Sequence, residues 1–336
     1  MIRRLGIQVA YRPRGAAEAR VGEGTMETID QVVGFLEAAG ALQPGKSPWP
    51  QYKESNGEWT RHRIDWPKLV GSSQDSGEKW PHPTEDIFDD VARRLDDRKS
   101  WGDPSKGELI EMAGRRGWDT CAWYQPIHYF GRGWGIFIQE DCVYRACLDI
   151  ARFLPHHAGT AATVASSLLL ASLMVYFLHE HYHHKVECLG IRLHVIDRRS
   201  SYLPYDALVY RPNVRSDEQL EEALANADAY LRLSTSPYGD RIGPDVRRAT
   251  RDYLKKTFPY DPPGYSRADR YLDWDRFDDA ENELKGRVHE HTLRPSQPSS
   301  DWAIATRLMQ SMGIVTDNIW VVVRAGSRSV FPVIYP

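Results

Sequence analysis

The chain has 336 residues, with 43 lysines and arginines against 46 aspartates and glutamates, which gives a formal net charge of −3. A chain of this length can bury a large core and is expected to form one elaborate domain or two. Its near-neutral charge excludes the strong basic field that attracts nucleic acid or anionic lipid, so we expect neither partner.

The cysteines and the N-terminal sequence bear on the cellular compartment. Cys121, Cys142, Cys147 and Cys188 include no CxxC pair, and so few cysteines in a long chain indicate reduced thiols. The first residues, MIRRLGIQVAYRPRG, are basic but lack the apolar stretch of a signal peptide. We therefore expect a cytoplasmic protein.

Residues 1–115 form the first of three predicted regions, and much of it reads as irregular. Between 44 and 83 the chain is rich in Pro, Gly, Ser and Trp, which predicts loops whose tryptophans pack on the rest of the protein. The alternative for these tryptophans is a peptide-binding face. The regular elements expected here are a strand at 7–11 and helices at 29–39, 85–97 and 106–116, the first of them capped by Thr28 and Gln31 and ended by Gly40.

Residues 116–290 form the predicted central region. The segments AWYQPIHYF and WGIFI flank the turn GRG, so we expect a β-hairpin at 122–138. Apolar positions recurring about every 3.6 residues predict a helix at 140–154 and a long helix at 159–188 that Gly190 ends. The later helices expected are at 217–233, opened by a capping box of Ser216 and Gln219, at 244–258 and at 267–287.

The long helix approaches the length of a membrane span. Residues 161–178 read AATVASSLLLASLMVYFL and run directly into the polar sequence HEHYHHKVE. Because many of these residues are Ala, Ser or Thr, the segment is only marginally hydrophobic enough for insertion. We therefore expect a buried core helix and no contact with a membrane.

Residues 291–336 form the third predicted region. The Pro- and Ser-rich sequence RPSQPSS at 294–300 reads as a linker, followed by a helix at 302–312 and a β-hairpin at 319–334 that turns at Gly326 and Ser327. The mixture of long helices with a few short strands predicts an α+β fold with an irregular N-terminal region and a small C-terminal helix-hairpin unit.

The sequence FLHEHYHH at 177–184 contains an HExxH motif formed by His179, Glu180 and His183. Helical residues four apart are separated by about 40° and one turn, so both imidazoles can bind a single metal ion. Glu180 lies about 100° round the helix, where its carboxylate can reach a water at the metal without being a ligand. The alternative is a helix end whose histidines complement the C-terminal dipole.

A catalytic zinc site needs a third protein ligand and an open position. The candidates are Glu221, Glu222 and His194. Glu187 follows His179 by eight residues, or about 12 Å along a helix, which is too far for both to bind one ion. We therefore expect Glu187 outside the ligand set, where it would orient His183 through the free ring nitrogen.

An HExxH helix followed by a glutamate on a later helix resembles the gluzincin metallopeptidases, which are thermolysin-like zinc proteases of the zincin type. The resemblance covers residues 122–233. In that group the third ligand often lies in an ExxxD arrangement, and this chain has Glu222 followed by Asn226. The resemblance implies that Glu222 binds Zn²⁺ and that Asn226 accepts a hydrogen bond from a ligand histidine.

The resemblance also implies a zincin-like core. In such a core the active-site helix packs on the second ligand-bearing helix beside a small antiparallel sheet, whose edge strand pairs with an extended peptide substrate. Glu180 would take a proton from zinc-bound water and pass it to the leaving amine. For the tyrosine or histidine that stabilises the oxyanion, we expect Tyr230 and His289, with Tyr238 and His291 as the other candidates.

These features together predict an intracellular zinc-dependent metalloendopeptidase that cleaves a specific protein or peptide substrate. An intracellular peptidase must limit its damage, so a regulatory protein partner is a further expectation. The alternative is an inactive zincin-like scaffold or regulatory protein that binds a partner, with its metal structural or absent. The Asn226 position, where the family has aspartate, leaves room for this alternative.

Overall fold

The computed structural model describes residues 29–48, 57–70, 91, 93–95, 102–155, 161–234, 242–291 and 318–334. The predicted strand at 7–11, the cap at Thr28, the linker at 294–300 and the helix at 302–312 lie outside the described residues, as does most of the predicted helix at 85–97.

The described elements follow one another along the chain in a mixed order of helices and strands. The strands are β1 (Trp59–Ile64), β2 (Ala122–Gln125), β3 (Gly135–Gln139), β4 (Ile319–Arg324) and β5 (Val333–Ile334). The α-helices are α1 (Ile29–Ala38), α2 (Trp66–Val70), α4 (Lys106–Arg116), α5 (Trp118–Cys121), α6 (Ile127–Phe130), α7 (Glu140–Ala151), α8 (Ala161–Asp197), α9 (Tyr202–Tyr205), α10 (Leu220–Arg232), α11 (Pro244–Thr257) and α12 (Trp274–Glu290). Shorter helical turns are η2 (Gly131–Gly133), the π-turn η3 (Asp206–Tyr210), η4 (Arg211–Asn213), η5 (Phe258–Tyr260) and η6 (Tyr265–Tyr271). The predicted α+β class is confirmed.

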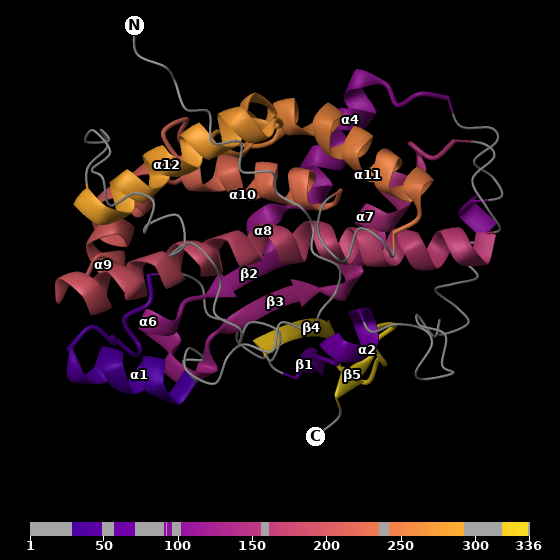
Figure 1. The fold of residues 1–336 in the computed structure, drawn as a ribbon. Coiled ribbons are helices and arrows are strands. Elements are labelled where there is room, and N and C mark those ends of the chain that lie inside the picture. The colour runs from indigo at the N-terminus through magenta and orange to yellow at the C-terminus, as the bar shows by residue number, and fades with distance from the viewer. Residues whose placement is uncertain are drawn as a thin grey trace, which may run out of the picture.

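Helix α8 runs through the middle of the fold. It contacts strands β2 and β3 on one side and helices α10 and α12 on the other, and α7 and α11 also pack on it. Figure 1 shows these layers, with the sheet below α8 and the helices α10, α11 and α12 above it. Because α8 has neighbours on every side, the part of its sequence before His179 is apolar on every face rather than along one stripe.

The apolar part of α8 is buried inside the protein. By length and composition alone, α8 is the one helix among the described residues that could cross a membrane, but 83% of its apolar window is covered by the rest of the chain. This burial supports the interpretation of the segment as a core helix.

The sheet is mixed and has the strand order β2-β3-β4-β1-β5. Strand β4 is parallel to β3 and antiparallel to β1, while the other neighbouring strands are antiparallel. The prediction of a purely antiparallel sheet is therefore wrong. Strand β2 lies at one edge of the described sheet and contacts α8. Because β3 pairs with its inner side, a further strand could pair only with its outer side.

Of the two predicted hairpins, the structure contains the first and not the second. The pair β2 and β3 confirms the first, although the chain between them forms α6 and η2 instead of a tight turn. The second is wrong, because β1 lies between β4 and β5 in the sheet. Strand β1 and helix α2 also replace part of the loop predicted at 44–83. All three predicted regions thus contribute strands to one sheet.

The glycine at 190 does not end the long helix, which continues to Asp197. A Cβ atom added at Gly190 would lie 2.7 Å from the Cβ of Tyr202, so this position is a close contact between α8 and α9. The predicted helix stop is therefore wrong. Because the helix continues, His194 stays on α8 and does not turn back toward His183.

Replacing Gly190 with Ala should lower the free energy of unfolding by about 1–3 kcal/mol, because the added methyl group overpacks the contact with Tyr202. The matched control is Gly114→Ala on α4, where no atom lies within 4 Å of an added Cβ. That change should be neutral or stabilise the protein by up to about 1 kcal/mol, as alanine favours a helix. Urea unfolding measures both, and equal free energies for the two variants would contradict this role of Gly190.

Most of the other predicted helices are confirmed, with shifts at some starts. The helices α1, α4, α7 and α11 occupy the expected positions, and Ser105 and Glu108 form a capping box for α4. Helix α10 begins at Leu220, three residues later than expected, because the side chain of Gln219 accepts from the backbone of Arg215 instead of capping the helix. Helix α12 begins at Trp274, after the turn η6.

Two of the cysteines are paired. A disulfide joins Cys121, at the end of α5, to Cys142, in the first turn of α7, while Cys147 and Cys188 are buried and form no disulfide. The expectation of four reduced thiols is therefore wrong for this pair. Since disulfides are typical of oxidising compartments, the cysteine argument no longer favours the cytoplasm.

Candidate metal centre

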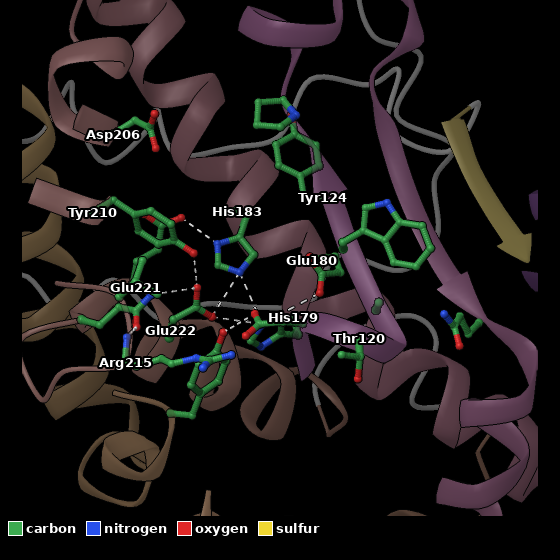
Figure 2. A pocket seen from close by; sticks show the side chains of 18 of the residues that line it. Thr120, Tyr124, His179, Glu180, His183, Asp206, Tyr210, Arg215, Glu221 and Glu222 are labelled. Carbon is green, nitrogen blue, oxygen red and sulfur yellow. Dashed lines mark hydrogen bonds and ion pairs between the residues drawn. The ribbon is translucent and has the colours of Figure 1, made fainter. Parts of the chain in front are cut away.

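Three side chains from two helices meet beside the sheet. His179 and His183 lie one turn apart on α8, and Glu222 lies in the first turn of α10. The two Nε2 atoms are 3.3 Å apart, and Oε2 of Glu222 lies 3.3 Å from Nε2 of His179 and 3.4 Å from that of His183. Figure 2 shows the three groups pointing toward one another. We call these residues the triad.

The outer nitrogen of each imidazole is held by an acceptor. Nδ1 of His179 is 2.8 Å from Oδ1 of Asn226, and Nδ1 of His183 is 2.7 Å from Oε1 of Glu221. An amide or carboxylate oxygen accepts a hydrogen bond, so these contacts place the imidazole proton on Nδ1 and leave a lone pair on Nε2. Asn226 therefore occupies the position expected from the sequence, and Glu221 supports His183 rather than joining the triad.

The triad has the geometry of three ligands of one ion. Bonds of about 2.0–2.1 Å in a tetrahedral arrangement separate the ligand atoms by about 3.4 Å. The three separations of 3.3, 3.3 and 3.4 Å match this value. In addition, Oε2 of Glu222 is buried and accepts no hydrogen bond from the described residues. Three unprotonated donor atoms this close together repel one another unless a cation or a proton lies between them.

The charges of the triad attract positive charge. Burial disfavours protonation of His183, but the carboxylates of Glu222 and Glu221 outweigh it and raise the pKa of His183 well above its usual value. Burial favours a neutral Glu222, but His183 and His179 outweigh it and hold its pKa below the usual range. Burial lowers the pKa of His179. Either a proton or a metal ion can supply the positive charge that the triad attracts.

Glu180 lies beside the triad without belonging to it. Its Oε1 is 4.0 Å from Nε2 of His179, and its side chain accepts a hydrogen bond from the backbone N–H of Tyr124 on β2. Burial raises the pKa of Glu180 to about 8, and the nearby carboxylates of Glu222 and Asp119 add to this effect. A cation at the triad would lower this pKa. Glu180 is therefore a carboxyl group placed to exchange a proton near neutral pH.

Neighbouring aromatic side chains hold the triad and its supporting carboxylate in place. The indole of Trp118 stacks on His179 with ring centroids 4.5 Å apart, and its N–H donates to Asp261 at 3.1 Å. The hydroxyl of Tyr205 donates to Glu221 at 2.6 Å, and that of Tyr210 donates to Oε1 of Glu222. Glu222 thus has one oxygen held by the protein and the other directed at the two imidazoles.

The triad opens into a cleft of about 750 Å³. Residues of α5 and β2 line one wall and the turn from 202 to 215 lines the other, as the labelled residues in Figure 2 show. The lining residues are Trp59, Asp119, Thr120, Ala122, Trp123, Tyr124, Pro126, Gln139, His179, Glu180, His183, Tyr202, Tyr205, Asp206, Tyr210, Val214, Arg215, Gln219, Glu221, Glu222, Tyr265 and Val322.

The residues expected to stabilise an oxyanion do not reach this cleft. Tyr230 is buried beneath the guanidinium of Arg251, which lies 4.3 Å from its ring, and His289 is half-exposed beside Asp197 at 3.4 Å. Neither residue lines the cleft, nor does His291. Tyr238 lies outside the described residues. The prediction of Tyr230 and His289 as the oxyanion-stabilising residues is therefore wrong. The tyrosines that line the cleft near the triad include Tyr210 and Tyr265.

Glu187 is near the site but does not orient His183. Its carboxylate accepts hydrogen bonds from the hydroxyl of Tyr124, from the backbone N–H groups of Ile127 and His128, and lies 2.6 Å from Nδ1 of His128. The expected contact with His183 is therefore wrong. Glu187 instead fixes the end of β2 and the start of α6 to helix α8.

His194 also lies apart from the triad. It is buried near the end of α8, where its ring packs against Phe35 of α1 with centroids 5.1 Å apart. Of the three candidates for the third ligand, the structure therefore brings Glu222 to the two histidines.

Sequence reasoning missed several residues of the cleft. They are Asp119, Tyr124, Tyr205, Tyr210, Arg215 and Tyr265. One available signal was the tyrosine-rich sequence SYLPYDALVY at 201–210, which comes shortly before the second ligand-bearing helix. No local pattern marks Asp119 or Tyr265, because the fold alone brings them together, at 2.6 Å between the tyrosine hydroxyl and the carboxylate.

Comparison of the chain with known protein families, curated proteins and solved structures found no match. The arrangement of its own side chains is therefore the basis for a functional assignment.

Proposed function

We propose that the protein is a zinc-dependent metallopeptidase with a zincin-like core. The observation that carries this proposal is the triad, whose three donor atoms lie 3.3–3.4 Å apart with the carboxylate of Glu180 beside them. Two imidazoles and one carboxylate, with room for a further ligand in a cleft, are typical of catalytic zinc. His179, His183 and Glu222 would hold the ion, which supplies the Lewis acidity that polarises a carbonyl and acidifies water.

Glu180 would act as the proton carrier. It is close enough to the triad to accept a proton from the attacking water and to deliver it to the leaving amine. Its position is fixed, because it follows His179 directly on α8 and accepts the backbone N–H of Tyr124. This contact also ties the proton carrier to the strand that lines the cleft.

Strand β2 would bind the substrate. It is an edge strand of the described sheet, and Ala122, Trp123 and Tyr124 line the cleft. An extended peptide can add to such an edge through backbone hydrogen bonds, which would place its carbonyl groups along the triad. This arrangement supports a peptide or protein as the substrate class. Tyr210 and Tyr265 line the cleft beside the triad and are the candidates to polarise the scissile carbonyl, which would have to replace Glu222 or Asp119 as the acceptor of the tyrosine hydroxyl.

The supporting carboxylate of Glu221 gives a first prediction about metal binding. Glu221→Gln should weaken zinc binding by about 10- to 100-fold, because the neutral amide makes the His183 ring less basic. Competition with a chromophoric chelator measures this affinity. Glu218→Gln is the matched control, since Glu218 is exposed and does not line the cleft. Equal zinc affinity in the two variants would contradict the role of Glu221.

Digestion of a peptide library tests the proposed activity. We expect the zinc-loaded protein to produce defined new N-termini, detected by mass spectrometry, and the chelator-treated protein to produce none. A zinc-loaded protein that cleaves no member of a diverse library, while still binding peptides, would favour an inactive scaffold instead.

A further inference from the structure

Arg215 lines the same cleft as the triad. It is the one arginine or lysine among the described residues that line the cleft, which also contains five carboxylates. In Figure 2 Arg215 lies on the side of Glu221 and Glu222, while Thr120 lies on the other side of His179. Arg215 is therefore the one permanently charged cation among the described residues that line the cleft, and it lies across the triad from the wall formed by α5.

The guanidinium of Arg215 forms no ion pair with the described residues, although acidic groups surround the cleft. Each of the carboxylates is already engaged elsewhere: Glu222 in the triad, Glu221 with His183 and Tyr205, Asp206 with Arg211, Asp119 with Tyr265, and Glu180 with the backbone of Tyr124. The positive charge of Arg215 is therefore available to a ligand in the cleft.

The backbone of Arg215 is held in an unfavourable conformation. Its φ of 60° lies in the left-handed region, which is uncommon for residues other than glycine. The other described non-glycine residues with positive φ, Arg198 and His291, follow the ends of α8 and α12 and do not line the cleft. Such strain persists where surrounding contacts enforce it, and it is concentrated at functional sites.

Gln219 enforces this conformation and links it to the triad. Its Oε1 accepts the backbone N–H of Arg215 at 2.8 Å, and its Nε2 donates to Oε1 of Glu222 at 3.5 Å. Gly264 packs behind this turn so closely that a Cβ there would lie 3.0 Å from Gln219. One buried side chain thus sets the position of Arg215 relative to a proposed metal ligand.

We propose that Arg215 binds a carboxylate of the substrate close to the scissile bond. A guanidinium binds a carboxylate with two parallel hydrogen bonds, a geometry that lysine cannot reproduce. The carboxylate belongs either to an acidic side chain or to the C-terminus of the peptide. Arg215 offsets the negative charge of the carboxylates that line the cleft, which disfavours the binding of either one. This inference rests on the proposed peptidase function, of which it names the substrate class.

A pair of metal-directed probes tests the inference without requiring turnover. One probe is the monohydroxamate of succinic acid, and the other is its analogue with a carboxamide in place of the carboxylate. Because hydrogen bonds between charged partners are worth about 1.5–3 kcal/mol, the zinc-loaded protein should bind the carboxylate probe about 10- to 100-fold more tightly. Isothermal titration calorimetry measures both dissociation constants.

Variants at two comparable arginines identify the residue that causes the preference for the carboxylate probe. Arg215→Gln should bind the two probes about equally, Arg215→Lys should keep part of the preference, and Arg215→Glu should reverse it. Arg198→Gln is the matched control, since Arg198 is also exposed with a φ of 57° but does not line the cleft. It should keep the full preference. Equal binding of the probes by the unaltered protein, or an undiminished preference in Arg215→Gln, would overturn the inference.

The outcomes also separate this inference from the function on which it rests. If neither probe binds, the metal centre itself is refuted and the inference falls with it. If the carboxylate preference is present but no peptide is cleaved, the peptidase activity is refuted and the anion site stands. Where peptides are cleaved, amidation of their C-termini distinguishes the two sources: it should abolish cleavage if the C-terminal carboxylate is bound and have no effect if an acidic side chain is bound.

Discussion

Replacing Glu180 with Gln should leave one zinc ion bound per chain and lower kcat for peptide hydrolysis by about 10²- to 10⁴-fold, the range for losing a positioned general base. The carboxylate of Glu180 lies 4.0 Å from Nε2 of His179, and it does not belong to the cluster of His179, His183 and Glu222 that could hold an ion. Glutamine has the same shape and can still accept the N–H of Tyr124, but it cannot take a proton from water. Metal analysis and steady-state kinetics on the same preparation measure the two effects.

The control for this substitution is again Glu218→Gln, which removes the same charge from the exposed turn before α10 and should leave kcat unchanged. A Glu180→Gln protein that retains full activity would refute the role of Glu180. A protein that loses both zinc and activity would show that Glu180 helps to hold the metal, which would contradict the geometry described above.

Replacing Glu222 with Ala should abolish stoichiometric zinc binding. Since outer contacts to a ligand change metal affinity by about 10- to 100-fold, the loss of a ligand should exceed that range. The effect is also expected to exceed that of Glu221→Gln, because Glu221 contacts only the outer nitrogen of His183. Chelator competition gives both affinities, and circular dichroism confirms that the variants are folded.

A purely structural role for Glu222 makes a different prediction. If Glu222 served only as the ion-pair partner of His183, its removal would destabilise the protein and leave zinc affinity unaltered. A folded Glu222→Ala protein that binds zinc as tightly as the unaltered chain would therefore contradict the triad as a metal centre.

The parts of the site that the sequence predicted are those set by local geometry. His179 and His183 share a face because they are four residues apart on a helix, and Asn226 follows Glu222 by the same spacing. The packing of α10 against α8 does not follow from local sequence, but the resemblance implied a ligand glutamate on the later helix. The structure brings these four residues together.

The parts that the sequence did not predict depend on contacts between distant segments. Gly190 reads as a helix stop, yet Tyr202 packs over it and the helix continues. Glu187 has the spacing of a residue that supports His183, yet the backbone of Ile127 offers it a donor from another segment. Tyr230 was expected in the cleft, but it lies under Arg251 of α11.

The strand order of the sheet also depends on contacts that the local sequence does not predict. Residues 319–334 have the alternation and turn of a hairpin, and their own sequence gives no sign that β1 lies between the two strands. Strand pairing over more than two hundred residues depends on which edges the rest of the fold leaves open. For this reason the C-terminal segment belongs to the central sheet rather than to a separate unit.

X-ray absorption spectroscopy at the zinc edge, on protein loaded with one equivalent of zinc, tests the metal centre most directly. We predict a shell of nitrogen and oxygen atoms at about 2.0–2.1 Å with the signature of two imidazoles, and no sulfur at about 2.3 Å. A sulfur donor that could compete is Cys188 on α8, whose Sγ lies 3.4 Å from Nε2 of His184. A sulfur shell, or a spectrum that His183→Ala leaves unchanged, would contradict the assignment of His179, His183 and Glu222 as the ligands.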